Sequence, residues 1–138
     1  KGTPKNMQAN PVYEALIPEI MDYFRESIRL AMKSGIAEDK IIIDPGIGFG
    51  KTFDHNLEII KNLREFTLLE KPLLVGVSRK AFIGKILGDA PASERLEGTA
   101  AAVAISILNG ANIFRVHDVK EMKKVALVAD AVKRGRVD

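Results

Sequence analysis

The sequence predicts an α/β fold in which short parallel strands alternate with helices and deliver functional groups to one edge of the sheet. Three apolar segments, residues 40–44, 73–77 and 113–116, lead to this prediction. Charged or polar residues stand at the carboxyl end of each segment, and a helical pattern follows each one. Buried parallel strands are near-continuous apolar runs, and sites in such folds lie at the carboxyl ends of the strands.

The composition is that of one domain with its own core, spanning residues 1–138, since 46% of the 138 residues are hydrophobic. The 21 lysines and arginines are spread along the sequence and leave a net charge of +3, which indicates solvated helix faces rather than nucleic-acid binding. The absence of cysteine excludes disulfides and thiolate metal sites. No apolar run approaches the ~20 residues of a membrane span, and no secretory segment is visible, so we expect a cytoplasmic location.

The first part of the chain predicts a loop and one long helix. Residues 1–11 contain two prolines and a glycine, which is typical of a loop. Helical spacing follows, with Pro18 at the start of the main helix, residues 12–17 as a separate turn, and Gly35 just past the end. The apolar residues at helical spacing are Ile17, Ile20, Met21, Phe24, Ile28 and Ala31.

The middle of the chain predicts a helix on either side of the second strand. Asp54 is expected to cap the first of these helices. Pro72 is acceptable at the start of the second strand, because its missing N–H need not join the ladder. Residues 81–87 predict a short helix. The buried face of the first helix is expected to consist of Leu57, Ile60, Leu63 and Phe66.

The C-terminal part predicts two further helices. Residues 98–108 are rich in alanine and other small residues, which favours a closely packed helix closed by Gly110. After the third strand, Asp118 and Glu121 predict a capping box for a last helix that ends at Gly135. The expected buried stripe of that helix consists of Met122, Val125, Ala129 and Val132.

Asp44, at the end of the first strand, is the first candidate functional residue. It either caps the following turn through the N–H of Gly46 or Ile47, or faces a ligand, and we favour the ligand. A carboxylate can accept two N–H donors side by side, and a 2-amino-4-oxo-pyrimidine ring offers such a pair. The glycines around Gly48 let backbone approach a flat ligand of this kind.

The glycine-rich loop after Asp44 contains one aromatic residue, Phe49. This side chain is either a core anchor for the loop or an aromatic wall for a flat substrate, and the sequence favours neither. The loop lacks the dinucleotide-binding spacing, because no helix begins directly on it with an acidic residue about 20 positions further on. Lys51 resembles the lysine of a phosphate-binding loop, but Pro45 stands where that motif needs its first glycine.

Cations stand at the other two strand ends. Lys80 is either surface charge or a compact donor that serves a ring nitrogen and a carbonyl together. Arg115 and His117 alternate along the third strand, so they share a face and can clamp an anion. A lone histidine is often an ordinary hydrogen-bonded side chain, but an arginine two residues earlier favours the clamp. His55 is expected to be ordinary surface.

Four motifs, in order, resemble those of the dihydropteroate synthase family. They are DPGIGFGK, GVSRK, SERLEGT and RVHD, which begin at residues 44, 76, 93 and 115, and residues 1–8 also resemble the family. The resemblance covers essentially the whole chain. It implies a (β/α)8 TIM barrel, which usually needs about 250 residues. The chain is therefore expected to hold about the last three βα units, strands six to eight.

The resemblance implies a transferase of folate biosynthesis that is a target of sulfonamides. This enzyme condenses p-aminobenzoate with 6-hydroxymethyl-7,8-dihydropterin diphosphate to 7,8-dihydropteroate and diphosphate. By motif position, Asp44 and Gly48 bind the pterin, Lys80 bonds its carbonyl and N5, and Arg115 covers its ring. Arg115 also holds the diphosphate together with His117.

The same resemblance assigns the remaining site residues. Lys80, Arg115 and His117 are the expected catalytic residues. Phe49, Lys80 and Ala81 are expected to border the aminobenzoate pocket. Ala81 stands where the family often has serine, so a hydroxyl contact is not expected there. Arg79 is expected to be structural.

The resemblance also implies Mg²⁺, bound through the diphosphate and a residue outside this chain, with no metal ligand within it. The expected partners are small-molecule substrates and a second copy of the chain, paired through the C-terminal helices. Nucleic acid and membranes are not expected partners. The chain alone is expected to be inactive without the N-terminal half. One alternative is a pterin-binding domain like that of methyltetrahydrofolate–corrinoid methyltransferases, which needs no anion clamp, and another is a non-catalytic fragment.

Overall fold

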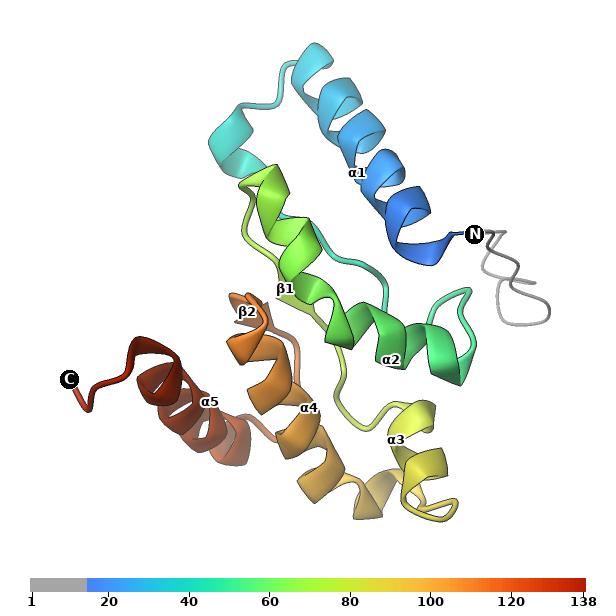
Figure 1. The fold of residues 1–138 in the computed structure, drawn as a ribbon, viewed down its shortest axis with the longest axis vertical. Coiled ribbons are helices and arrows are strands. Elements are labelled where there is room, and N and C mark those ends of the chain that lie inside the picture. The colour runs from blue at the N-terminus through green and yellow to red at the C-terminus, as the bar shows by residue number, and fades with distance from the viewer. Residues whose placement is uncertain (1–14) are drawn as a thin grey trace.

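The structure is a computed structural model, and it describes residues 15–138 (Figure 1). The loop expected at residues 1–11 and the first half of the turn expected at 12–17 lie outside the described residues. The helices are α1 (Leu16–Lys33), α2 (Phe53–Lys61), α3 (Ala81–Ile86), α4 (Leu96–Leu108) and α5 (Val119–Arg134). Short 3-10 helices are η1 (Glu38–Lys40), η2 (Leu63–Leu69) and η3 (Ala92–Glu94), and the strands are β1 (Leu74–Val75) and β2 (Ile113–Phe114).

The three expected strands lie side by side and parallel, as predicted, but they are shorter than predicted. β1 pairs with β2 in the register Leu74 to Ile113. The first segment joins this sheet through a single parallel bridge between Ile43 and Leu73. Lys40 is not in a strand, because its backbone N–H donates to the Ala37 carbonyl at 2.9 Å and so closes η1. The fold is therefore α/β with parallel strands, reduced here to a two-stranded sheet and one bridge.

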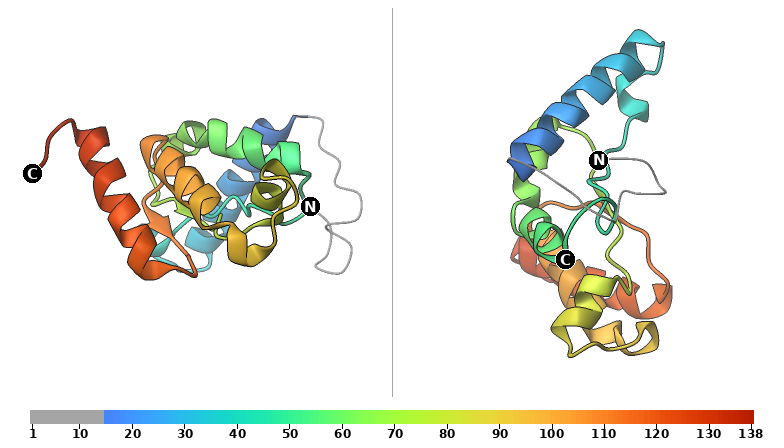
Figure 2. Two further views of the ribbon diagram at one scale, coloured as in Figure 1. Left: turned by 90° about the horizontal axis from the view of Figure 1, so that it is seen from below. Right: turned by 90° about the vertical axis from the view of Figure 1, so that its right-hand side faces the viewer.

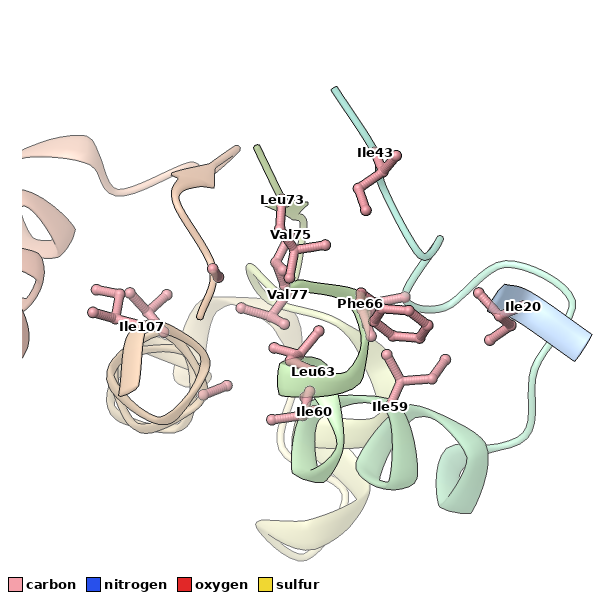
Figure 3. Close-up of a cluster of buried hydrophobic side chains, with 14 of the residues drawn as sticks. Ile20, Ile43, Ile59, Ile60, Leu63, Phe66, Leu73, Val75, Val77 and Ile107 are labelled. Carbon is pink, nitrogen blue, oxygen red and sulfur yellow. The ribbon is translucent and has the colours of Figure 1, made fainter. Parts of the chain in front are cut away.

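Alternate residues of the middle strand point toward the helices. Leu73, Val75 and Val77 are completely buried, and Figure 3 shows them beside Leu63 and Ile60 of the helical layer. Because side chains alternate along extended backbone, Gly76 and Ser78 belong to the opposite face. This alternation separates a core face, covered by α2, η2 and α4, from a face that carries the polar residues.

Helix α1 lies at one end of the elongated molecule and α3 at the other (Figures 1 and 2). The helix begins at Leu16, so the expected start at Pro18 is wrong. Pro18 falls in the first turn, where the backbone N–H has no partner within the helix, and proline therefore removes no hydrogen bond. Phe24 packs edge-on against Phe66 with ring centroids 5.6 Å apart, which ties α1 to η2. Gly35 follows the helix with a φ of +97°, as expected.

Helix α2 is capped by Thr52, and the prediction of Asp54 as the cap is wrong. The Thr52 hydroxyl accepts from the His55 N–H, while His55 Nδ1 accepts from the Thr52 N–H, both at 3.1 Å. His55 is thus a partly exposed residue in the first turn of α2, as expected, and it also forms a capping box that the sequence analysis did not predict. Leu57 was expected in the core but is exposed. Ile59, which was not predicted to be buried, lies in the core instead.

The last two helices pack against each other, with Met122 of α5 buried. Helix α4 ends at Leu108 and Gly135 ends α5 with a φ of +77°, as predicted. The predicted capping box is wrong, because the Asp118 side chain makes no cap hydrogen bond and binds Arg79 instead. Val132 is exposed, so it is not part of the buried stripe. Within residues 15–138, none of the helices has the length and apolar character that a membrane crossing requires.

Candidate functional site

Asp44 holds the turn after the first segment and also faces a cation. One carboxylate oxygen, Oδ1, accepts from the Gly46 N–H at 2.8 Å. The other, Oδ2, lies 3.7 Å from Nη2 of Arg115. The turn-capping role that the sequence offered as one alternative is therefore confirmed for Oδ1, whereas contact of the carboxylate with a ligand stays a prediction. The Asp44 side chain is 37% exposed, so it can accept further donors.

Arg115 reaches Asp44 by crossing the middle strand. A Cβ atom built at Gly76 would lie 3.0 Å from Nη2 of Arg115, so the guanidinium lies directly over this glycine. Any side chain at this position would push the guanidinium away. The Arg115 side chain remains 64% exposed, which leaves most of its donors available to an anion or a ring.

Lys80 and Phe49 form the other side of the site. The Lys80 Nζ lies 4.4 Å from the centroid of the Phe49 ring, a cation–π contact. Phe49 is 48% exposed, so it is not a core anchor, and its ring is available as a wall. Gly48, with a φ of +88°, lets the lysine stem pass, since a Cβ there would lie 3.3 Å from its Cδ.

The charges around Lys80 act on its pKa in opposite directions. Burial of the ammonium lowers the pKa, the nearby Arg115 lowers it further, and Asp44 raises it. Lys51 is a second lysine in the same region, and its Nζ donates to the Phe49 carbonyl at 2.8 Å. Burial lowers the pKa of Lys51 as well, against the opposing effect of Asp44. Asp44 is thus the shared anion of both ammonium groups.

His117 is tied to Ser78 on the neighbouring strand. The Ser78 Oγ lies 2.8 Å from Nδ1 of His117 and accepts from the His117 backbone N–H at 3.1 Å. The histidine residue itself is exposed, whereas Ser78 is buried. The imidazole is therefore anchored at Nδ1, on a residue that is exposed as a whole.

The Arg79 side chain is engaged in contacts within the protein. Its Nη2 and Nε donate to the two oxygens of Asp118 at 2.8 and 3.2 Å, which raises the pKa of Arg79 and lowers the pKa of Asp118. Its backbone has a φ of +55°, its N–H donates to the Thr99 hydroxyl, and its carbonyl accepts from Arg95. These contacts fix the backbone that leads into Lys80.

The structure brings Asp44, Phe49, Lys80 and Arg115 together at one edge of the sheet. Ala81 is the exposed first residue of α3, beside Lys80, and its methyl group offers no hydrogen bond. Sequence reasoning missed the buried Asn56, whose Oδ1 accepts from the Gly48 N–H at 2.8 Å and holds the glycine loop. It also missed the role of Ser78. The available signal was a hydroxyl residue at the point where the apolar segment gives way to two cations, Arg79 and Lys80.

Comparison with known proteins assigns the chain to a family. A model of the pterin binding enzyme family matches residues 1–117. Dihydropteroate synthase from Escherichia coli (strain K12) is 45% identical over 131 residues, which are 95% of this chain and 46% of that protein. The protein of the same name from Bacillus subtilis (strain 168) is 44% identical over 87% of this chain and 42% of its own length. The chain thus spans about half the length of these relatives.

Solved structures give the same result. The dihydropteroate synthase of Yersinia pestis with a sulfonamide drug complex superposes with a TM-score of 0.95 at 40% identity, over 99% of this chain and 49% of that one. The enzyme from Thermus thermophilus in complex with 6HMPPP has a TM-score of 0.87 at 33% identity, over 94% and 51%. The resemblance to dihydropteroate synthase is therefore confirmed, and the chain belongs to the family of pterin binding enzymes.

Proposed function

We propose that this chain is the C-terminal portion of a dihydropteroate synthase and supplies its pterin-holding and diphosphate-holding groups. The observation that carries the proposal is the convergence of Asp44, Lys80 and Arg115 on the exposed face of three adjacent parallel segments. The 40–45% identity to several dihydropteroate synthases supports it. The proposed reaction joins p-aminobenzoate to 6-hydroxymethyl-7,8-dihydropterin diphosphate.

The pterin ring fits the charges of this face. The Asp44 carboxylate accepts from the 2-amino group and the adjacent ring N–H, while the Lys80 ammonium donates to the carbonyl and N5. The Arg115 guanidinium lies over the ring, and Gly48 lets the backbone approach it. Phe49, Lys80 and Ala81 border the aminobenzoate, and sulfonamides compete for that position.

The chemistry needs an anion site more than an acid or a base. The bond between the pterin methylene carbon and the diphosphate oxygen breaks, and the electron pair leaves with the diphosphate. Arg115 and a ring N–H of His117 hold that anion as its charge grows, while the carbon becomes a cation delocalised over the pterin. The amine nitrogen then forms the new C–N bond and releases a proton to solvent. Positioning and electrostatic stabilisation of this kind supply several kcal/mol without a covalent intermediate, roughly 3–10.

The described residues provide no cage for Mg²⁺. Among residues 15–138, no group of three or more His, Asp or Glu side chains is placed to hold a metal ion. Mg²⁺ would be bound through the diphosphate oxygens and a residue outside this chain, and it would neutralise part of the leaving anion. No step attributed to Asp44, Lys80, Arg115 or His117 depends on it.

The remaining features of the proposal concern assembly. The three parallel segments form the last three βα units of a (β/α)8 barrel, and residues 1–138 are part of that single domain. The chain requires the N-terminal half of the enzyme for turnover and works in the cytoplasm. It pairs with a second copy through its C-terminal helices, which the exposed apolar side chains Leu127, Val128 and Val132 of α5 support.

Condensation of the two substrates tests the proposal. Purified chain, alone and combined with the N-terminal half of a dihydropteroate synthase, is incubated with both substrates and Mg²⁺, and dihydropteroate is quantified. We expect product in the combined sample, little in the chain alone, and a loss of at least about 100-fold with Lys80→Met. Product at the same rate from the Lys80→Met variant, or none from any combined sample that binds pterin, contradicts the proposal.

A further inference from the structure

Ser78 makes two contacts with the same residue on the next strand. Its Oγ accepts from the backbone N–H of His117 at 3.1 Å and lies 2.8 Å from Nδ1 of the His117 ring. Ser78 is only 5% exposed, so its hydroxyl is largely removed from water. Among the described residues, His117 Nδ1 is the acceptor within reach of the hydroxyl proton.

The number of protons decides the direction of the second contact. A serine hydroxyl has one proton and two lone pairs, whereas a backbone N–H can only donate. The His117 N–H therefore takes a lone pair of Oγ, and the hydroxyl proton still needs an acceptor. A buried donor without an acceptor costs about 1–3 kcal/mol, which favours donation from Oγ to Nδ1. A neutral imidazole that accepts at Nδ1 carries its proton on Nε2.

We infer that Ser78 is a positioning residue that fixes the neutral His117 ring as the Nε2–H tautomer. The exposed edge of the ring then presents an N–H donor to an anion, rather than a lone pair that would repel it. When the ring is protonated, Nδ1–H donates to Oγ and Nε2–H still faces outward. His117 is thus an N–H donor in both protonation states. This inference rests on the proposed function only where it names the anion, the diphosphate of the substrate.

Nitrogen-15 NMR of the histidine rings tests the tautomer directly. The chain has two histidines, so a His117→Gln variant assigns the signals. His55 is an internal reference, because its Nδ1 accepts from the Thr52 N–H and its neutral ring must therefore also carry the proton on Nε2. We expect His117 at high pH to show the same Nε2–H pattern as His55. A predominant Nδ1–H form, or an even mixture, overturns the inference.

Two variants test whether Ser78 sets this preference. Ser78→Ala should leave His117 as a mixture of tautomers, and Ser78→Thr, which keeps the hydroxyl, should restore the Nε2–H form. An unchanged tautomer in folded Ser78→Ala overturns the role of Ser78, and the His55 signal reports whether the variant is folded. If Ser78→Ala does not fold, the His117 tautomer is compared in Ser78→Thr and the unmodified chain. The inference requires the Nε2–H form in both.

Titration with inorganic diphosphate separates this inference from the proposed function. We expect diphosphate affinity to fall about tenfold in Ser78→Ala and to recover in Ser78→Thr. Diphosphate binding together with an Nδ1–H tautomer overturns the inference and leaves the proposed function standing. An Nε2–H tautomer without diphosphate binding contradicts the proposed anion site and leaves the tautomer assignment standing.

Discussion

The Arg115 guanidinium lies 3.7 Å from the Asp44 carboxylate, although the two residues follow the outer segments of a three-segment parallel array. The guanidinium lies over Gly76, which follows β1 in the middle segment, and a Cβ atom there would approach Nη2 of Arg115 to 3.0 Å. Because Gly76 has no side chain, Arg115 can reach across the middle segment toward Asp44. The two charges can therefore face the same ligand.

Replacement of Gly76 by alanine should affect the site and spare the fold. The new methyl group meets the mobile end of Arg115, which can move, so we expect little change in thermal midpoint. Pterin diphosphate affinity should fall about tenfold, because the guanidinium is displaced. Gly84→Ala is the control: its methyl group would meet the Ala90 carbonyl at 2.7 Å, so it should lower the thermal midpoint. Unchanged affinity in a folded Gly76→Ala chain would argue against the placement of Arg115.

The pKa of Lys80 should move in opposite directions in two variants. Arg115→Met removes a cation that lowers this pKa, so the pKa should rise toward its ordinary value. Asp44→Asn removes the anion that raises it, so the pKa should fall further. NMR titration of the lysine side chains measures both shifts.

Lys51 is the internal control for this pair of variants. Asp44 raises the pKa of Lys51 and Arg115 is not among the groups that shift it, so only Asp44→Asn should lower it. Shifts of Lys80 in the same direction in both variants would contradict the arrangement of charges around it.

The Arg79–Asp118 pair should make stability depend on pH. Hydrogen bonds from Arg79 hold the pKa of Asp118 below its usual range, so the folded state binds this proton less readily than the unfolded state. The stabilisation is complete above about pH 4 and disappears as the pH falls through the lowered pKa. Urea unfolding should show a deficit for Asp118→Asn at pH 7 that shrinks near pH 3.

Asp130→Asn provides the comparison for this measurement. Asp130 pairs with Arg134 on the exposed surface of α5, and exposed pairs contribute little to stability. Its effect should be small at both pH values. A deficit for Asp118→Asn that stays constant from pH 7 to pH 3 would show that the pair does not account for the pH dependence.

The sequence predicted the edge at which the polar residues meet, because parallel strands end on the same side. It did not predict how short the strands are. The backbone bond from Arg115 to Val75 is already 3.4 Å long, so the ladder loosens where the polar residues begin. Strand length depends on such pairing between distant segments, which apolar patterning does not record.

The competition between local and distant partners explains the other differences. Asp118 matches a capping box, but a bidentate arginine 39 residues away takes its carboxylate. Aspartate is a favoured capping residue, but Asp54 does not cap α2. Thr52 is the N-cap residue, and it forms reciprocal hydrogen bonds with His55. Ser78 could not be recognised as a partner of His117 until the register of the two strands was known.

Calorimetric titration of the purified chain with the pterin diphosphate and Mg²⁺, beside Asp44→Asn, tests the central claim most directly. Asparagine keeps an oxygen for the Gly46 N–H, which Asp44 Oδ1 accepts at 2.8 Å, so the turn should survive while the negative charge is lost. We predict binding by the unmodified chain and an affinity at least about tenfold weaker in the variant. Equal binding by both chains would contradict the assignment of Asp44 as the residue that holds the pterin.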